Sequence, residues 1–257
     1  MIRCYAALLA ALICGELAAA QGREVVVGVY QNTPKIVAAA DGSPSGIFGD
    51  LLQVIAAEQN WRIKAVQCDW AYCLQMLQSG EIDLLPDVAF TELRSLQLDF
   101  HQTPALYSWS QLYTAQGVQL QSLAELDGKR IIVLQESVQQ QYLQNMISQS
   151  GMDVVLLRAR SMPEAFAMAS AGQADAVAAN HYSGHFQLAK YQLEQSNVIF
   201  QPLQFFYATK KQHNQDLLAV IETRLAQWQT NISSPYYQIL QRWGTEVPEQ
   251  TLPEKVW

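Results

Sequence analysis

The stretch LQSGEIDLLPD, residues 77–87, has a counterpart later in the chain, ASAGQADAVAAN, residues 169–180. Each runs from the end of a helical pattern through a glycine to an aspartate, an apolar strand and a polar position. Strands that alternate with helices predict parallel sheets. The repeat therefore predicts an α/β protein of two lobes. Sites in such sheets lie beyond the carboxyl ends of strands, where Asp87 and Asn180 stand.

Further apolar runs extend both units. Six short runs are typical of strands: residues 24–30, 62–67, 82–86, 130–135, 154–157 and 174–179, the first of them β-branched, apolar and expected to be buried. The segments between them carry apolar residues at helical spacing, and Gly80 and Gly151 stand where such helices end. Two amphipathic helices are expected near the end of the chain, over residues 217–228 and 235–244.

Two extended aromatic runs, YSWSQLYTA (107–115) and QPLQFFYAT (201–209), bracket the second unit. We expect the chain to cross from the first lobe to the second in one run and to return in the other. Lobe 1 is therefore predicted to contain residues 21–110 and 205–257, and lobe 2 residues 111–204.

The first twenty residues have the layout of a secretory signal peptide. Arg3 precedes a short apolar stretch, and three alanines, Ala18 to Ala20, precede Gln21. The apolar stretch is too short for a membrane anchor. We expect export to the periplasm as a soluble mature chain that begins near residue 21.

Composition and motifs exclude several functional classes. The 257 residues carry a net charge of −7, which argues against a nucleic-acid or anionic-membrane surface. The sequence has no P-loop, no G-x-G-x-x-G and no G-x-S-x-G motif, so no cofactor is expected. His181 and His185 are four residues apart and could share a helix face, but no third ligand is suitably spaced, so no metal site is predicted.

Two cysteines, Cys68 and Cys73, remain after removal of the signal peptide. In an oxidising compartment they are expected to form a disulfide, and the alternative of two buried free thiols stays open.

Four side chains are candidates for a ligand site, each with a structural alternative. Arg94 offers paired N–H groups to a carboxylate, although it could be an exposed arginine on a surface helix. Tyr30 and Trp70 could form the walls of a cleft or belong to the core. Ser137, at a strand-to-helix turn, suits an anion and could equally be a plain N-cap.

The order of the motifs resembles the bacterial extracellular solute-binding proteins of family 3, the polar amino-acid-binding type. The landmarks extend over nearly the whole mature chain: VVVGVY, G-x-x-x-D at Gly46 to Asp50, GEID followed by T-x-x-R, LDGKRIIVLQES, GQADAV, FFYATKK and PYYQILQRWG. The resemblance implies a two-lobed periplasmic-binding-protein fold of type II, with parallel-rich sheets flanked by helices and two crossover hinge strands.

The resemblance also implies a site. In such proteins the arginine of T-x-x-R, here Arg94, holds the carboxylate of the ligand. The remaining implied ligand-binding residues are Asp87, Ala89, Phe90 and Thr91 beside it, the aromatic walls Tyr30 and Trp70, and Ser137, Val138 and Asn180 from lobe 2.

One departure from the family pattern bears on the ligand. Members that bind α-amino acids place an aspartate where this chain has Asn180, and a neutral amide gives up most of the attraction for an ammonium. Asp87 replaces a small residue and could take over the ammonium, or pair with Arg94. A free amino acid, a carboxylate without an amine and a peptide-like or aromatic compound all stay open.

The leading expectation is a non-enzymatic, monomeric periplasmic binder of a small carboxylate-bearing solute, whose partner is either an ABC permease or a signalling protein. C-x-W-x-x-C-L and PDVAF-T-x-x-R also resemble periplasmic sensor modules of membrane histidine kinases, and the tail LPEKVW resembles the sequence before their membrane helix. A cyclohexadienyl-dehydratase-like enzyme, with Asp87 or Glu136 as general acid, is a third class. The fourth class is a signalling module that binds no ligand, because its own side chains fill the cleft.

Overall fold

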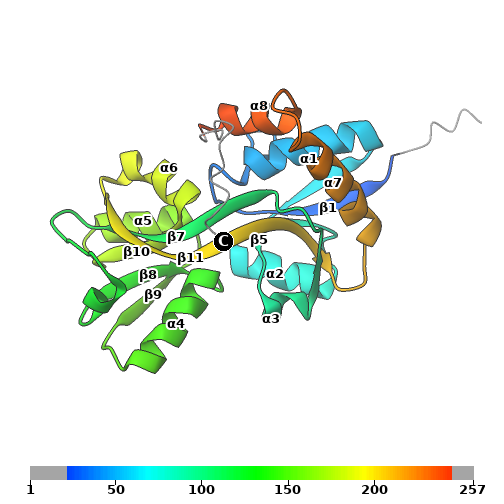
Figure 1. The fold of residues 1–257 in the computed structure, drawn as a ribbon. Coiled ribbons are helices and arrows are strands. Elements are labelled where there is room, and N and C mark those ends of the chain that lie inside the picture. Colours follow the sequence, from blue (N-terminus) through cyan, green and yellow to red (C-terminus); the bar gives the residue numbers. More distant parts are fainter. Residues whose placement is uncertain (1–21, 245–257) are drawn as a thin grey trace, which may run out of the picture.

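The chain forms two lobes joined by two long strands, as Figure 1 shows for the computed structural model. Residues 22–244 are described by the structure, so the predicted signal peptide and the tail LPEKVW lie outside the described residues. Within residues 22–244, no helix combines the length and apolarity needed to cross a membrane.

Lobe 1 is built around two short parallel strands, β1 (Glu24–Val29) and β4 (Arg62–Gln67), with Val27 opposite Ala65. Val25 and Val27 of β1 are buried in the core of the lobe. Helix α1 (Gly46–Gln59) packs on this core through Ile47, Leu51 and Ile55, which are fully buried. The other elements of the lobe are β2 (Val37–Ala38), β3 (Pro44–Ser45), α1 (Gly46–Gln59), α2 (Trp70–Ser79), β5 (Leu85–Ala89), α3 (Glu92–Ser95), β6 (Leu98–Phe100), α7 (Gln215–Trp228) and α8 (Pro235–Arg242).

Lobe 2 has three parallel strands, β8 (Arg130–Leu134), β9 (Val155–Ala159) and β10 (Ala176–Asn180). Its helices are η1 (Leu123–Leu126), α4 (Val138–Ser150), α5 (Met162–Ser170) and α6 (His181–Tyr191). Side chains of the residues before α4, α5 and α6 cap each helix by accepting a hydrogen bond from a backbone N–H in the first turn.

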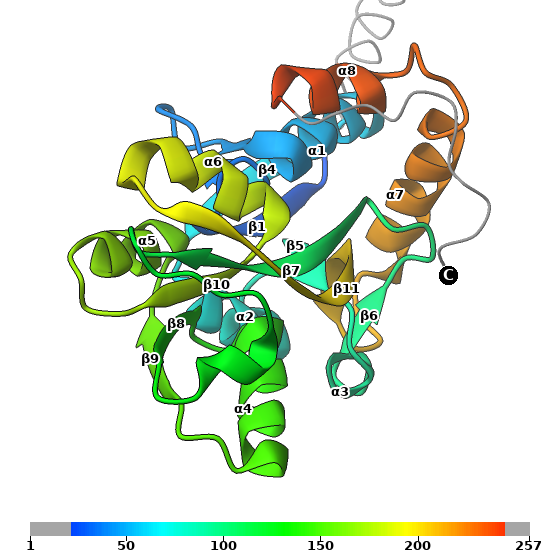
Figure 2. The same ribbon diagram turned by 60° about the vertical axis from the view of Figure 1, so that its left-hand side comes forward.

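The two crossover strands are β7 (Leu106–Thr114) and β11 (Glu194–Lys210), which pair antiparallel along most of their length. β11 also pairs with β5, and β7 also pairs with β10. One sheet of order β5-β11-β7-β10-β8-β9 therefore runs through both lobes, and β6 pairs with β11 outside this order. Figure 2 shows both strands running between the two sets of helices. The pairs β1–β4, β8–β9 and β8–β10 are therefore parallel, whereas the crossover strands pair antiparallel with each other and with β5, β6 and β10.

Three predicted elements differ from the structure. The strand expected at 82–86 is β5, which begins at Leu85 because the backbone N–H groups of Asp83 and Leu84 bond back to Val26 of β1. The segment after Asn180, for which the sequence suggested only that His181 and His185 could share a helix face, is the full helix α6. The second crossover run, expected at 201–209, begins seven residues earlier in β11.

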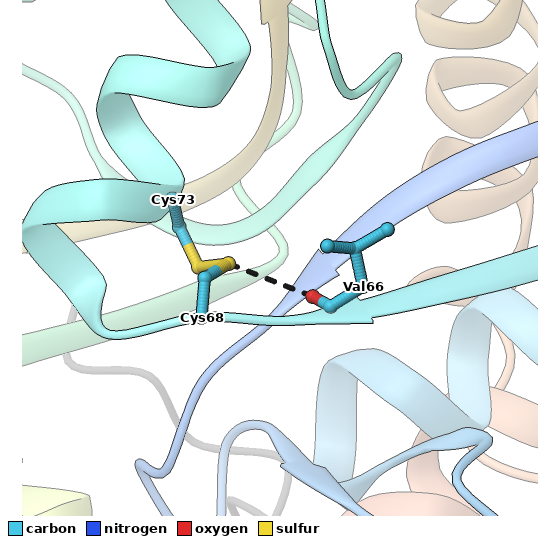
Figure 3. Close-up of a disulfide and its surroundings, with 3 residues drawn as sticks. All are labelled: Val66, Cys68 and Cys73. Carbon is cyan, nitrogen blue, oxygen red and sulfur yellow. Dashed lines mark hydrogen bonds between the residues drawn. A yellow bond between two sulfur atoms is a disulfide. The ribbon is translucent and has the colours of Figure 1, made fainter.

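A disulfide between Cys68 and Cys73 ties the end of β4 to the first turns of α2, with the two Cα atoms 5.4 Å apart (Figure 3). The sulfur of Cys68 lies 3.5 Å from the carbonyl oxygen of Val66. The covalent link fixes the start of α2, and this is the helix turn that carries Trp70.

Candidate ligand site between the lobes

A buried polar cluster surrounds Asp87 in lobe 1. Asp87 lies in β5 with a φ of 62°, and it is 1% exposed. Its Oδ1 accepts from Lys35 Nζ at 2.6 Å, and its Oδ2 accepts from Tyr30 OH at 2.6 Å and Asn32 Nδ2 at 2.8 Å. Three donors therefore satisfy both carboxylate oxygens from within the same lobe.

Lys35 is the partner that the sequence did not reveal. Its side chain is 1% exposed, and its ammonium lies 3.6 Å from the centre of the Phe205 ring. Burial lowers the pKa of Lys35 and raises the pKa of Asp87, while the attraction between the two groups opposes both shifts. A proton that moves from one group to the other leaves the charge of the pair at zero.

Arg94 is held at the mouth of the cleft. Thr91 caps the short helix α3 by accepting from Arg94 N at 3.1 Å, and this places the guanidinium so that Nη1 donates to Ala89 O at 2.8 Å. The guanidinium also lies 5.2 Å from the centre of the Trp70 ring. Burial lowers the pKa of Arg94 to about 10, so the group remains charged at neutral pH.

Polar contacts join the lobes across the cleft. The carbonyl oxygen of Glu136, in the turn between β8 and α4, accepts from Trp70 Nε1 at 3.2 Å and Arg94 Nη2 at 3.0 Å. Glu136 takes a φ of 60°, a conformation that a residue with a side chain adopts only at a cost. Ser183 of α6 donates to Asn32 Oδ1 from the opposite side. Trp70, Arg94 and Asn32 thus bind lobe 2 directly.

The N-termini of two helices, α4 and α6, form the lobe 2 wall of the site. Ser137 caps α4 by accepting from Gln140 N at 3.1 Å, and Val138 and Gln139 follow it in the first turn. Asn180 caps α6 by accepting from Ser183 N at 3.2 Å. The first N–H groups of a helix favour an anion, so this wall complements a carboxylate.

The space enclosed between these walls is small. The inner cavity has a volume of about 30 Å³, which fits about two water molecules. Its lining is Tyr30, Asn32, Lys35, Trp70, Asp87, Ala89, Arg94, Leu134, Ser137, Val138, Gln139, Met162, Asn180 and Phe205. An outer groove of about 410 Å³ begins at Arg94 and runs between α3 and α4, with Thr91, Glu136 and Gln140 among its walls.

Most of the residues predicted for the site line the inner cavity, namely Tyr30, Trp70, Asp87, Ala89, Arg94, Ser137, Val138 and Asn180. Thr91 lines the outer groove instead. Phe90 points away from the cavity and packs edge-on against Phe100 at 5.3 Å. The Asp87–Arg94 ion pair considered from the sequence does not form, because Lys35 occupies the carboxylate.

Sequence reasoning missed Asn32, Lys35, Leu134, Gln139, Met162 and Phe205. Phe205 lies within a predicted crossover strand, and the side-chain alternation of that strand could have indicated that it faces inward. Lys35 gives no such signal, since lysine is almost never fully buried and its partner is 52 positions away.

His181 and His185 both lie in helix α6. Across residues 22–244, no three His, Cys, Asp or Glu side chains come together in a geometry that could hold a metal ion. His181 is instead stacked on Trp109, with ring centres 3.8 Å apart.

Residues 25–246 match the family described as bacterial extracellular solute-binding proteins, family 3. A search of curated protein sequences found no match.

Similar solved structures share the fold at low identity. A histidine kinase sensor domain with similarity to periplasmic binding proteins matches at a TM-score of 0.75 and 20% identity, over 87% of this chain and 96% of that chain. An ancestral arginine-binding protein bound to glutamine matches at 0.76 and 23% identity, over 87% and 98%. The amino acid ABC transporter substrate-binding protein AbpA from Streptococcus pneumoniae, bound to L-arginine, matches at 0.74 and 20%, over 86% and 94%. With the family match covering most of its length, the chain belongs to the bacterial extracellular solute-binding proteins of family 3.

Proposed function

We propose that the protein binds a small carboxylate-bearing solute between its lobes in the periplasm, with Arg94 as the anchor. The observation that carries the proposal is the set of partners of that guanidinium. Within residues 22–244, both acceptors found for it are backbone carbonyl oxygens, at Ala89 and Glu136. A carboxylate is the stronger acceptor and can take two N–H groups at once, so it would replace the Glu136 carbonyl.

The charge of the inner cavity favours a monoanion over a zwitterion. Among the residues that line it, Lys35 and Arg94 are cations and Asp87 is the single carboxylate. The Lys35–Asp87 pair is neutral wherever its proton lies, so the lining residues carry one net positive charge, at Arg94. The ammonium of an amino acid would find Asp87 already bound to three donors.

Binding would require the lobes to separate. A cavity of about 30 Å³ is too small for a solute of amino-acid size. Opening would break the bonds from Trp70 and Arg94 to Glu136, and a bound carboxylate would compensate by bonding Arg94 and the start of α4. A solute stabilises whichever lobe arrangement gives it more contacts.

Calorimetry against matched pairs of solutes tests the proposal. Each pair differs only by the amine: propionate and alanine, glutarate and glutamate, 3-phenylpropionate and phenylalanine. We expect at least one acid to bind, and Arg94→Ala to weaken it by about 30-fold or more, since truncating one partner of a buried charge pair costs about 2 kcal/mol or more. Arg62→Ala, at an exposed arginine of β4, is the matched control. Equal affinity in wild type and Arg94→Ala would show that the anchor is wrong.

A second candidate function is a sensor module that closes without solute. The observation in its favour is the size of the inner cavity, which the chain fills with its own Lys35, Trp70 and Phe205. Small-angle scattering with and without the solute panel separates the two functions. A compact shape that no member changes, together with no heat of binding, would favour the self-closed module.

We also propose that the protein performs no chemistry on its solute. Both oxygens of Asp87 are engaged by donors of lobe 1, which leaves that carboxyl without a proton to give to a leaving group. Incubation with prephenate or arogenate should release no carbon dioxide, and turnover would overturn this part of the proposal. The partner would be an ABC permease or a membrane sensor kinase, with the protein itself acting as a monomer.

A further inference from the structure

A second, larger pocket is lined mainly by the crossover strand β7 and helix α6. It has a volume of about 750 Å³, within the range of small-molecule sites, whereas the inner cavity is about 30 Å³. We call it the aromatic pocket, because Trp109 of β7 and His181, Tyr182 and Phe186 of α6 form its walls. Figure 2 shows α6 lying against β7, the arrangement that brings these side chains together.

The wall is a preformed stack of flat rings. Trp109 and His181 lie parallel, with ring centres 3.8 Å apart and planes 10° apart, and the Tyr182 ring is tilted by 36° to His181 with its centre 4.0 Å away. Ser108 Oγ hydrogen-bonds His181 Nδ1 at 2.8 Å and fixes the imidazole in the stack. Trp109 is 38% exposed and Phe186 is 49% exposed. Both side chains line the pocket, so a molecule bound in it would cover them.

The chemistry of the lining selects an uncharged occupant. The described residues that line the pocket include no Asp, Glu, Lys or Arg. Burial lowers the pKa of His181 to about 4, and the positive charge of the nearby Lys35 adds to this shift. The imidazole is therefore neutral at pH 7. A charged ligand would lose its hydration without gaining a charged partner. The exposed amide of Gln195 supplies hydrogen-bonding groups that suit a neutral polar edge, whereas the amide of Gln111 is already bonded to Trp109 Nε1 and Ser196 O.

The pocket also touches both lobes. Pro34 and Trp243 contribute from lobe 1, opposite α6 of lobe 2. Pro34 belongs to the same loop as Asn32 and Lys35, which line the inner cavity, and Asn32 accepts a hydrogen bond from Ser183 of α6. An occupant would therefore contact the two elements that meet at one edge of the cleft.

We propose that the aromatic pocket is a second binding site, specific for an uncharged planar aromatic or heteroaromatic molecule of one or two rings. The molecule stacks on the Trp109 ring system, and its contacts with both lobes stabilise the lobe arrangement described above. The site is separate from Arg94, so it stands whether or not the cleft binds a carboxylate.

The test uses the uncharged naphthalene dye prodan as probe, with the anionic dye 1-anilinonaphthalene-8-sulfonate as the comparison for charge. We expect prodan to bind with a blue-shifted emission and indole to displace it. Trp109→Ala and Phe186→Ala should each weaken prodan at least 10-fold. Ile199→Ala, at an exposed apolar side chain of β11 outside the pocket, should leave the affinity unchanged. Phe186 is half exposed, so its variant folds even if the Trp109 variant does not.

Several results would overturn the proposal. Equal prodan binding by wild type and Phe186→Ala would place the dye elsewhere, and a preference for the anionic dye would contradict the charge argument. A concentration-dependent dimer in sedimentation that Phe186→Ala abolishes would make the pocket an interface between two copies. Prodan binding by a chain ended at Gly244, but not by the full chain, would make residues 245–257 the occupant.

Discussion

Replacing Lys35 with methionine tests how much the buried Lys35–Asp87 ion pair contributes to the free energy of unfolding. The two groups are each 1% exposed, and their closest atoms are 2.6 Å apart. Methionine preserves most of the side-chain volume and removes the charge, so that the carboxylate of Asp87 stays buried with Tyr30 and Asn32 as its donors. Removing one partner of a buried pair costs about 3–5 kcal/mol, because the remaining charge is left uncompensated.

The expected loss converts to a melting temperature. For a protein of this size, each kcal/mol of unfolding free energy shifts Tm by about 2–4 °C, so Lys35→Met should melt about 6–20 °C below wild type. The deficit should grow with pH. Without Lys35 the pKa of Asp87 is raised further, so the folded variant favours the protonated acid. Its stability relative to wild type is therefore best at low pH and falls as pH rises above about 3.9, the unfolded value.

Urea unfolding at pH 5 and pH 7, followed by circular dichroism, measures both effects. The double variant Lys35→Met/Asp87→Asn removes the orphaned charge and should recover at least half of the loss, since asparagine tolerates the positive φ of 62°. A Lys35→Met variant within about 0.5 kcal/mol of wild type would refute the reasoning. So would a double variant whose loss equals the sum of the two single losses.

Three further predictions concern other parts of the molecule. Reduction of Cys68–Cys73 should lower the unfolding free energy by about 2 kcal/mol, from the entropy of a loop this short, and a thermal melt with and without reductant measures it. Gly184→Ala should cost about 1–3 kcal/mol in urea unfolding, because its Cβ would lie 2.0 Å from the ring of Tyr113. Burial lowers the pKa of His101 to about 4 from 6.5, so its contribution is complete above pH 6.5 and is lost as pH falls toward 4. Over that interval wild type should lose about 3 kcal/mol more than His101→Gln.

The sequence was informative wherever local pattern decides structure. The repeated glycine, aspartate and apolar strand of residues 77–87 and 169–180 predicted the two units, and the aromatic runs near 107–115 and 201–209 predicted the strands that join them. Apolar periodicity and capping residues act over a few positions, so they can be read from the chain alone. Arg94 is also positioned by a local contact, because the side chain of Thr91, three residues earlier, accepts a hydrogen bond from its backbone N–H.

What the sequence did not reveal depends on distant partners. Helix α6 forms through a segment containing Gly184, because the ring of Tyr113 packs directly on that part of the helix backbone. Lys35 stands in a turn-rich segment with no periodicity, and its burial is stabilised by the Asp87 carboxylate 52 positions later and by the Phe205 ring, whose centre lies 3.6 Å from its ammonium. Interactions of this kind are set by tertiary packing, which leaves no local pattern.

The two departures from the family pattern, Asp87 and Asn180, have one explanation in the Lys35–Asp87 pair. Asp87 brings a carboxylate to the cleft, but the ammonium it binds belongs to Lys35 of the same lobe. Asn180 is neutral, and its side-chain oxygen is used to cap α6. Among the described residues that line the inner cavity, no other carboxylate remains to receive an amine. A solute's carboxylate would still gain Arg94, whereas its ammonium would be desolvated without a partner. The amine should therefore weaken binding, and propionate-like acids should bind more tightly than their amino-acid counterparts.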